Sequence, residues 1–118
     1  MIKAYYVLRK DLNMSVAKLA VQVGHGTQLL MLSEPKELLG KWKDLESDSR
    51  KIVCGISSYE KLRNLYYDLN QYIKVQVIQD SGYTEFNGKE FTGVAFFVDE
   101  QNAPAEVLKK VKRLQLYK

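Results

Sequence analysis

The sequence has a single cysteine, a single histidine and two prolines among its 118 residues. Cys54 therefore has no partner for an internal disulfide, which favours a reducing compartment. One histidine excludes a metal site built from several histidines, and a structural zinc site of the usual ligands is not expected either. No apolar run approaches the ~20 residues that a membrane-spanning helix needs. Because the segment 1–6 is typical of a strand rather than of a signal peptide, we expect a cytoplasmic protein with no membrane partner.

What is present is typical of a globular protein. Hydrophobic residues make up 46% and charged residues 27% of the chain, which excludes a disordered chain, a collagen and a coiled-coil rod. The length predicts one domain over 1–118. The net charge is +4, and neither the first ten nor the last ten residues contain an acid. If both ends lie on one side of the fold they form a basic surface that suits a polyanionic partner; the alternative is solvated helix and strand ends.

The hydrophobic pattern predicts the element order β-α-α-β-α-β-β-α. Strands are expected at 2–8, 51–56, 75–80 and 91–98, where β-branched and aromatic residues gather. Helices are expected at 15–32, after Pro35, after Ser57, and from Ala103 to about Leu114. Strands that alternate with helices predict a three-layer α/β/α sandwich with a four-stranded mixed sheet. In such sheets sites gather beyond the carboxyl ends of strands, here at 9–15 and 80–85.

The helix expected at 15–32 is apolar apart from one narrow polar stripe. Ser15, Lys18, Gln22 and His25 follow the spacing i, i+3, i+7 and i+10, which places them along one line of the helix. This pattern predicts the wall of a polar cleft. The alternative is a partly buried helix that shows its solvent edge, with His25 a structural residue.

A second polar group follows the third expected strand. The segment 80–84 reads Asp-Ser-Gly-Tyr-Thr and offers a carboxylate, two hydroxyls and a turn glycine. Turns favour the same residues, so this motif is weak by itself. Tyr83 is the tyrosine most expected to face a ligand. Cys54 lies within an apolar strand, where a buried, inert thiol is expected rather than a nucleophile.

Taken together, these segments resemble the type II peptidyl-tRNA hydrolase family of archaea and eukaryotes. Residues 9–14 read Arg-Lys-Asp-Leu-Asn-Met, and the helix carries the family pattern Lys-x-x-x-Gln-x-x-His at 18–25. The family's second motif, Asp-Ala-Gly-x-Thr, is matched by 80–84. The chain departs from the family pattern, as a divergent member, at Ala17, Gly26, Ser81, Tyr83 and Glu85.

The resemblance implies hydrolysis of the ester between peptide and tRNA in peptidyl-tRNA, without a metal or cofactor. It implies Lys18, Asp80 and Thr84 as the catalytic group. Lys18 would hold developing negative charge or a nearby phosphate, Asp80 would orient Lys18 or polarise water, and Thr84 would bind the carbonyl or the water. A histidine base, His25, is the alternative. The residues expected to contact substrate are Gln22, His25, Arg9, Lys10 and Tyr83. A homodimer is also expected from the resemblance.

Two other classes of function stay open. One is a catalytically silent module on the same fold that binds RNA or protein. The other is an esterase or deacylase for a smaller substrate. Cleavage of an N-acylated aminoacyl-tRNA distinguishes them.

Overall fold

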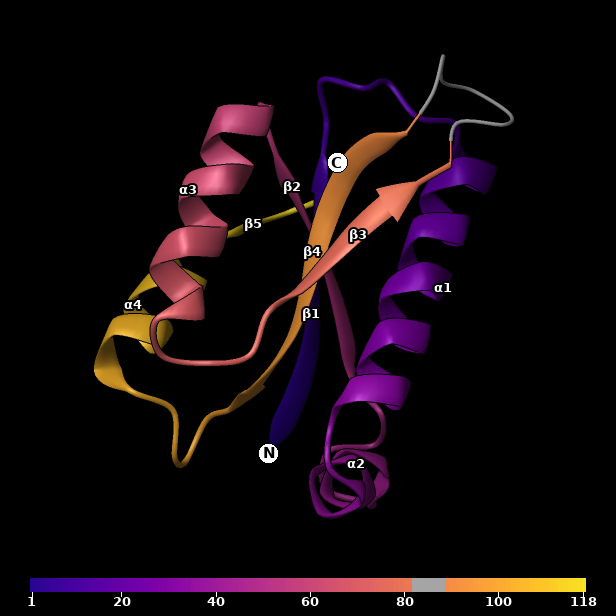
Figure 1. Cartoon of the computed structure of the whole chain (residues 1–118). Helices are drawn as coiled ribbons and strands as arrows, with labels where there is room; N and C mark the ends of the chain where they lie inside the picture. The colour runs from indigo at the N-terminus through magenta and orange to yellow at the C-terminus, as the bar shows by residue number, and fades with distance from the viewer. Residues whose placement is uncertain (82–88) are drawn as a thin grey trace.

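In the computed structural model the chain forms strands and helices in nearly the expected order (Figure 1). The structure describes residues 1–81 and 89–118. The elements in chain order are β1 (Ile2–Arg9), α1 (Val16–Ser33), α2 (Lys36–Lys43), β2 (Lys51–Ile56), α3 (Tyr59–Asn70), β3 (Gln76–Asp80), β4 (Glu90–Asp99), α4 (Ala105–Lys112) and β5 (Gln115–Leu116).

The sheet has the strand order β3-β4-β1-β2-β5. β1 runs parallel to β2, and the other neighbouring strands are antiparallel, so the sheet is mixed. The expectation of four strands is wrong, because five strands form within the described residues. The last helix ends at Lys112 instead of continuing to Leu114, and Gln115 and Leu116 pair with β2. A strand of two residues has no alternation for a sequence pattern to detect.

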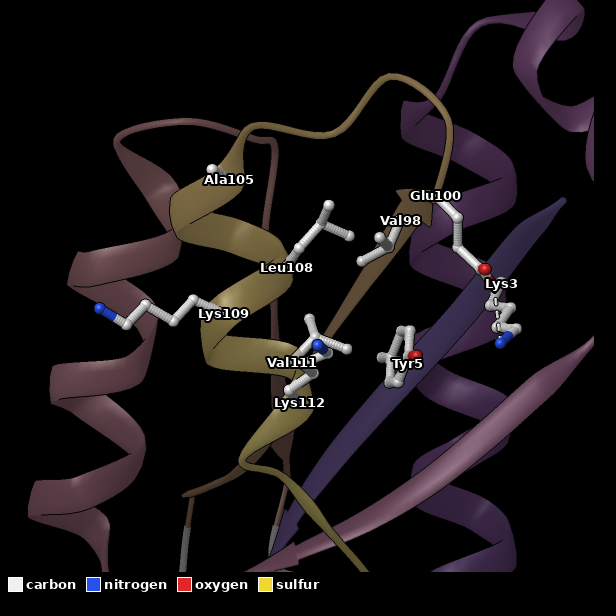
Figure 2. A pocket seen from close by; sticks show the side chains of 9 residues that line it. All are labelled: Lys3, Tyr5, Val98, Glu100, Ala105, Leu108, Lys109, Val111 and Lys112. Atoms are coloured by element: carbon white, nitrogen blue, oxygen red, sulfur yellow. Dashed lines mark ion pairs between the residues drawn. The ribbon is translucent and has the colours of Figure 1, made fainter.

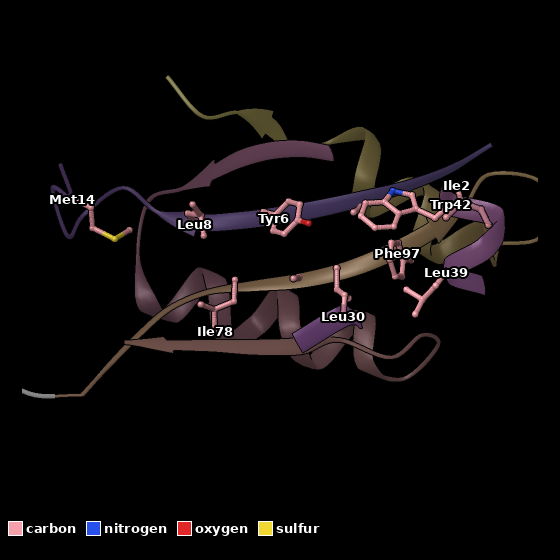
Figure 3. Close-up of a cluster of buried hydrophobic side chains, with 11 residues drawn as sticks. Ile2, Tyr6, Leu8, Met14, Leu30, Leu39, Trp42, Ile78 and Phe97 are labelled. Carbon is pink, nitrogen blue, oxygen red and sulfur yellow. The ribbon is translucent and has the colours of Figure 1, made fainter. Parts of the chain in front are cut away.

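Helices cover both faces of the sheet, as three layers require. Figure 1 shows α1 and α2 on one side of the sheet and α3 and α4 on the other. Alternate residues of β1 point to opposite faces: Tyr6 and Leu8 pack on the α1 side, and Tyr5 and Val7 on the α3 side. Figure 3 shows the core on the α1 side, which consists of Ile2, Ala4, Tyr6, Leu8, Met14, Leu30, Leu39, Trp42, Ile78, Ala95 and Phe97.

β4 lies between β1 and β3 and is almost entirely buried, as its apolar sequence predicts. Gly93 allows its close approach to β1, because a Cβ atom there would lie 2.5 Å from the carbonyl oxygen of Val7. A register shift interrupts the pairing with β3: Ile78 pairs with Gly93, whereas Gln79 pairs with Phe91. Thr92 is therefore the extra residue of a β-bulge.

Among the described residues, no helix is long and apolar enough to cross a membrane.

Candidate functional site

The polar stripe of α1 faces the sheet. Lys18 and Gln22 are buried, with exposed fractions of 8% and 0%. Ser15 caps the helix, and its side-chain oxygen accepts a hydrogen bond from the backbone N–H of Lys18 at 3.1 Å. His25 lies three residues after Gln22 on the same stripe and is half-buried. Because Lys18 and Gln22 are buried, the middle of the stripe faces the sheet and is not a solvent edge.

Asp80 meets this stripe from the end of β3. One of its carboxylate oxygens, Oδ2, lies 2.9 Å from the ammonium nitrogen of Lys18. The same oxygen accepts a hydrogen bond from the Gln22 amide at 2.8 Å. Asp80 is 4% exposed, so the ion pair is buried on both sides. Two segments 58 residues apart in the sequence are thus joined by charge and hydrogen bonds, as the sequence predicted for Lys18 and Asp80.

Thr92 completes the group and was missed by the sequence reasoning. Its hydroxyl donates to the side-chain oxygen of Gln22 at 2.7 Å, with the carbonyl oxygen of Ile78 further away at 3.3 Å. Thr92 is fully buried. The available signal was a lone hydroxyl within the apolar segment 91–98. We refer to Lys18, Gln22, Asp80 and Thr92 as the polar cluster.

Arg9 is buried next to the beginning of β4. Its guanidinium binds Asp11 through two hydrogen bonds, of 3.1 and 2.7 Å. It also donates to Glu90 at 2.8 Å and to the carbonyl oxygen of Phe91 at 2.9 Å. The hydrogen bonds from Arg9 hold the pKa of the Asp11 carboxyl below its ordinary value, and those to Asp11 raise the pKa of Arg9. Arg9 therefore ties the end of β1 to the start of β4, and its contact with substrate stays a prediction.

The remaining predicted site residues lie apart from these contacts or outside the described residues. Lys10 is exposed, and its ammonium group lies 5.9 Å from the centre of the Tyr117 ring. Thr84 and Tyr83 fall within 82–88, outside the described residues. In the described ranges, no three His, Cys, Asp or Glu side chains are grouped so as to hold a metal ion.

Cys54 is buried, as predicted, with 2% of its surface exposed. Burial raises the pKa of its thiol. A protonated thiol inside the core is a poor nucleophile. This environment supports the expectation that Cys54 packs and does not react.

Basic residues from both ends of the chain line two hollows of the surface together. Figure 2 shows a groove of about 600 Å³ between α4 and the strands β1 and β4. Its lining consists of Lys3, Tyr5, Val98, Glu100, Ala105, Leu108, Lys109, Val111 and Lys112. Lys3 forms an ion pair with Glu100 at 2.6 Å. At the second place, Lys10 and Lys118 line one depression with Gln115 and Leu116. The groove lies on the α3 side of the sheet, away from the polar cluster, because Tyr5 belongs to the core of that face.

The chain is similar in sequence to one family of known proteins over nearly its whole length. A family model described as "Peptidyl-tRNA hydrolase PTH2" matches residues 2–117. A peptidyl-tRNA hydrolase of Sulfurisphaera tokodaii is 33% identical over 119 residues, covering 92% of each chain. A peptidyl-tRNA hydrolase of Thermoplasma acidophilum is 26% identical, covering 95% of this chain and 97% of its own length. Another from Thermoplasma volcanium is also 26% identical, with 96% and 98% covered.

Proposed function

This chain belongs to the peptidyl-tRNA hydrolase family PTH2, and we propose that it hydrolyses the ester that joins the peptide to tRNA, releasing free tRNA and peptide. The observation that carries this proposal is the buried ion pair between Lys18 and Asp80, with 2.9 Å between Nζ and Oδ2. The pair lies where the first turn of α1 meets the end of β3. It supplies a fixed cation and a fixed carboxylate at one point, which can stabilise an oxyanion and polarise a water during ester hydrolysis.

Lys18 stabilises the negative charge that develops on the carbonyl oxygen when water attacks the ester. A cation that is already in place costs no reorganisation during the reaction, and burial strengthens its field. Asp80 keeps the ammonium group in place and polarises the attacking water. Thr84 belongs to the same proposal, as a hydrogen-bonding group for the carbonyl or the water, on the strength of the sequence motif alone.

The position of His25 favours Asp80 over a histidine base. His25 lies seven residues after Lys18 on α1. At a rise of about 1.5 Å per residue, their backbones are roughly 10 Å apart along the helix. Asp80, by contrast, is in direct contact with Lys18, with 2.9 Å between Oδ2 and Nζ. We therefore assign His25 to substrate contact further along the helix, with Gln22 between it and the reacting group.

We propose that basic side chains outside the polar cluster bind the phosphate backbone of the tRNA. Lys10 is exposed and follows β1 directly, whereas Arg9 is engaged by two carboxylates. The lysines of the terminal segments add diffuse attraction. Contacts of this kind fix the position of the phosphate backbone without reading the sequence of the tRNA. Because peptidyl-tRNA arises during translation, we place this activity in the cytoplasm.

We also propose a homodimer in which α1 packs against α1 of a second copy. The side of α1 that faces away from the sheet exposes large apolar residues. The exposed fractions are 84% for Val16, 45% for Val21, 44% for Met31 and 78% for Leu32. A self-complementary contact of this face about a two-fold axis would bury them. Light scattering after gel filtration tests this: Val21→Glu together with Leu32→Glu should give a monomer, and a monomeric wild-type chain contradicts the proposal.

The decisive experiment for the activity is cleavage of an N-acetylated aminoacyl-tRNA by the purified chain, with a simple N-acetyl amino acid ester in parallel. Rapid cleavage of the tRNA ester, lost in Lys18→Ala, supports the proposal. Cleavage of the small ester alone indicates an esterase for smaller substrates. Binding of the tRNA without cleavage indicates a silent RNA-binding module.

A further inference from the structure

We propose that Thr92 is a positioning residue, which fixes the carboxylate of Asp80 through the side-chain amide of Gln22. This inference rests on the proposed function of the Lys18–Asp80 pair. Three donor–acceptor steps connect the four side chains. The Thr92 hydroxyl donates to Gln22 at 2.7 Å, Gln22 donates to Asp80 Oδ2 at 2.8 Å, and Lys18 meets the same oxygen at 2.9 Å.

Each hydrogen bond in this series can be donated in only one direction. An ionised carboxylate only accepts hydrogen bonds, so the NH₂ group of Gln22 must face Asp80. The amide oxygen of Gln22 then faces Thr92, whose hydroxyl supplies its proton to that oxygen. Both Gln22 and Thr92 are 0% exposed, so bulk water cannot replace either partner. Thr92 thereby fixes the orientation of the amide, and the amide fixes the oxygen that pairs with Lys18.

The β-bulge gives Thr92 this position. Strict alternation along β4 would place Thr92 on the same face as Val94 and Phe96, which pack on the α3 side. Because the register shifts between Ile78 and Gln79, the side chain of Thr92 instead turns towards α1. Bulges that re-aim one side chain are common beside functional sites. The bulge thus brings the Thr92 hydroxyl into contact with Gln22.

The competing explanation is that Thr92 only packs in the core, and Thr27 provides a matched control. Thr27 is a partly buried threonine on α1 whose hydroxyl lies 2.7 Å from that of Tyr6 and donates to the carbonyl oxygen of Val23 at 2.9 Å. Thr27→Val therefore removes a hydrogen-bonded hydroxyl from α1 itself, without changing a contact of Asp80. Thr92→Val removes the hydroxyl that donates to Gln22 and keeps the side-chain volume. Thr92→Ser keeps the hydroxyl and removes only the methyl group.

The test compares the wild type with these three variants in steady-state cleavage of N-acetylated aminoacyl-tRNA. We expect Thr92→Val to lower kcat about ten-fold with little change in KM, since one neutral hydrogen bond is worth about one factor of ten. Thr92→Ser should restore most of kcat, and Thr27→Val should lower only the melting temperature. The proposal is overturned if Thr92→Val retains the wild-type kcat, or if Thr92→Ser is as impaired as Thr92→Val.

A second measurement is independent of activity. The side-chain NH₂ signals of Gln22 in an ¹⁵N-correlated NMR spectrum should shift and exchange faster with water in Thr92→Val, but not in Thr27→Val. If the wild-type chain does not cleave the ester, the proposed function fails, and these signals still decide whether Thr92 orients Gln22. Unchanged signals in Thr92→Val overturn the positioning role whatever the activity.

Discussion

Two ion pairs of equal length but different burial allow the contribution of the Lys18–Asp80 pair to be measured. Lys18 and Asp80 lie 2.9 Å apart with side-chain exposed fractions of 9% and 5%. Lys110 and Asp68 also lie 2.9 Å apart, but their side chains are 41% and 45% exposed. The perturbation is a double-mutant cycle on each pair, Lys→Met with Asp→Asn. A cycle isolates the interaction between two residues from their separate contributions to stability.

The structure predicts different coupling energies for the two pairs. Unit charges 2.9 Å apart attract by about 6 kcal/mol at an effective dielectric constant near 20, and by about 1.4 kcal/mol in water. Loss of one partner from a buried pair typically costs about 3–5 kcal/mol, because the other charge stays buried and uncompensated. Exposed pairs contribute about 0.2–1 kcal/mol. We therefore expect a coupling of several kcal/mol for Lys18–Asp80 and below about 1 kcal/mol for Lys110–Asp68.

Urea unfolding followed by far-UV circular dichroism gives these coupling energies, and cleavage of N-acetylated aminoacyl-tRNA gives the rates. Removal of the ammonium group in Lys18→Met should lower kcat on the order of 100-fold or more. Lys110→Met should keep kcat and weaken binding only modestly, with a slightly flatter salt dependence. Equal coupling energies in the two cycles would contradict the conclusion that burial strengthens the Lys18–Asp80 interaction. If Lys18→Met changed KM alone, Lys18 would be a phosphate clamp and the catalytic role would pass to Asp80.

Three further predictions concern the core. Gly26→Ala should lower the free energy of unfolding by about 1–3 kcal/mol, because the added Cβ would lie 2.9 Å from the Tyr6 ring. Gly40→Ala is the control: no atom of the described residues packed around it lies within 4 Å of the added Cβ, so this substitution should raise the free energy of unfolding in the same urea titration. Cys54→Val should keep kcat within a factor of about two, since one small hydrophobe replaces another; loss of turnover in a folded variant would indicate a thiol mechanism. Burial raises the pKa of Tyr6 above its ordinary 10.0, so its stabilising contribution is complete below pH 10.0 and is lost as pH rises through the higher folded-state pKa. The Tyr6→Phe variant should therefore lose less stability than the wild type between pH 9 and 11.5 in the same urea titration. An equal loss in both proteins would contradict a raised pKa of Tyr6 as the cause.

Much of the architecture could be predicted because its signals are local. The aromatic and β-branched residues of β1 and the apolar run of β4 identify strands whatever surrounds them. The spacing of Lys18 and Gln22 places both side chains on one line of α1, and the strand that ends at Asp80 brings the carboxylate to the same end of the sheet. What local patterns could not show was β5, since two residues contain no period, or the side of α1 that faces solvent. That side is apolar at Val16 and Leu32, whereas an ordinary surface helix presents its polar residues to water.

Thr92 marks the limit of this kind of prediction. Its residue type is visible in the sequence, but its direction depends on the pairing between β3 and β4. Regular alternation assigns its hydroxyl to the α3 side, where the neighbouring core is apolar. There the hydroxyl would need a partner that this core does not offer, at a cost of about 1–3 kcal/mol. The one-residue bulge removes this cost, because the same hydroxyl then reaches Gln22 at 2.7 Å. The bulge and the polar cluster therefore stabilise each other, and a variant that straightens β4 should disturb Asp80 even though it changes no residue of the cluster.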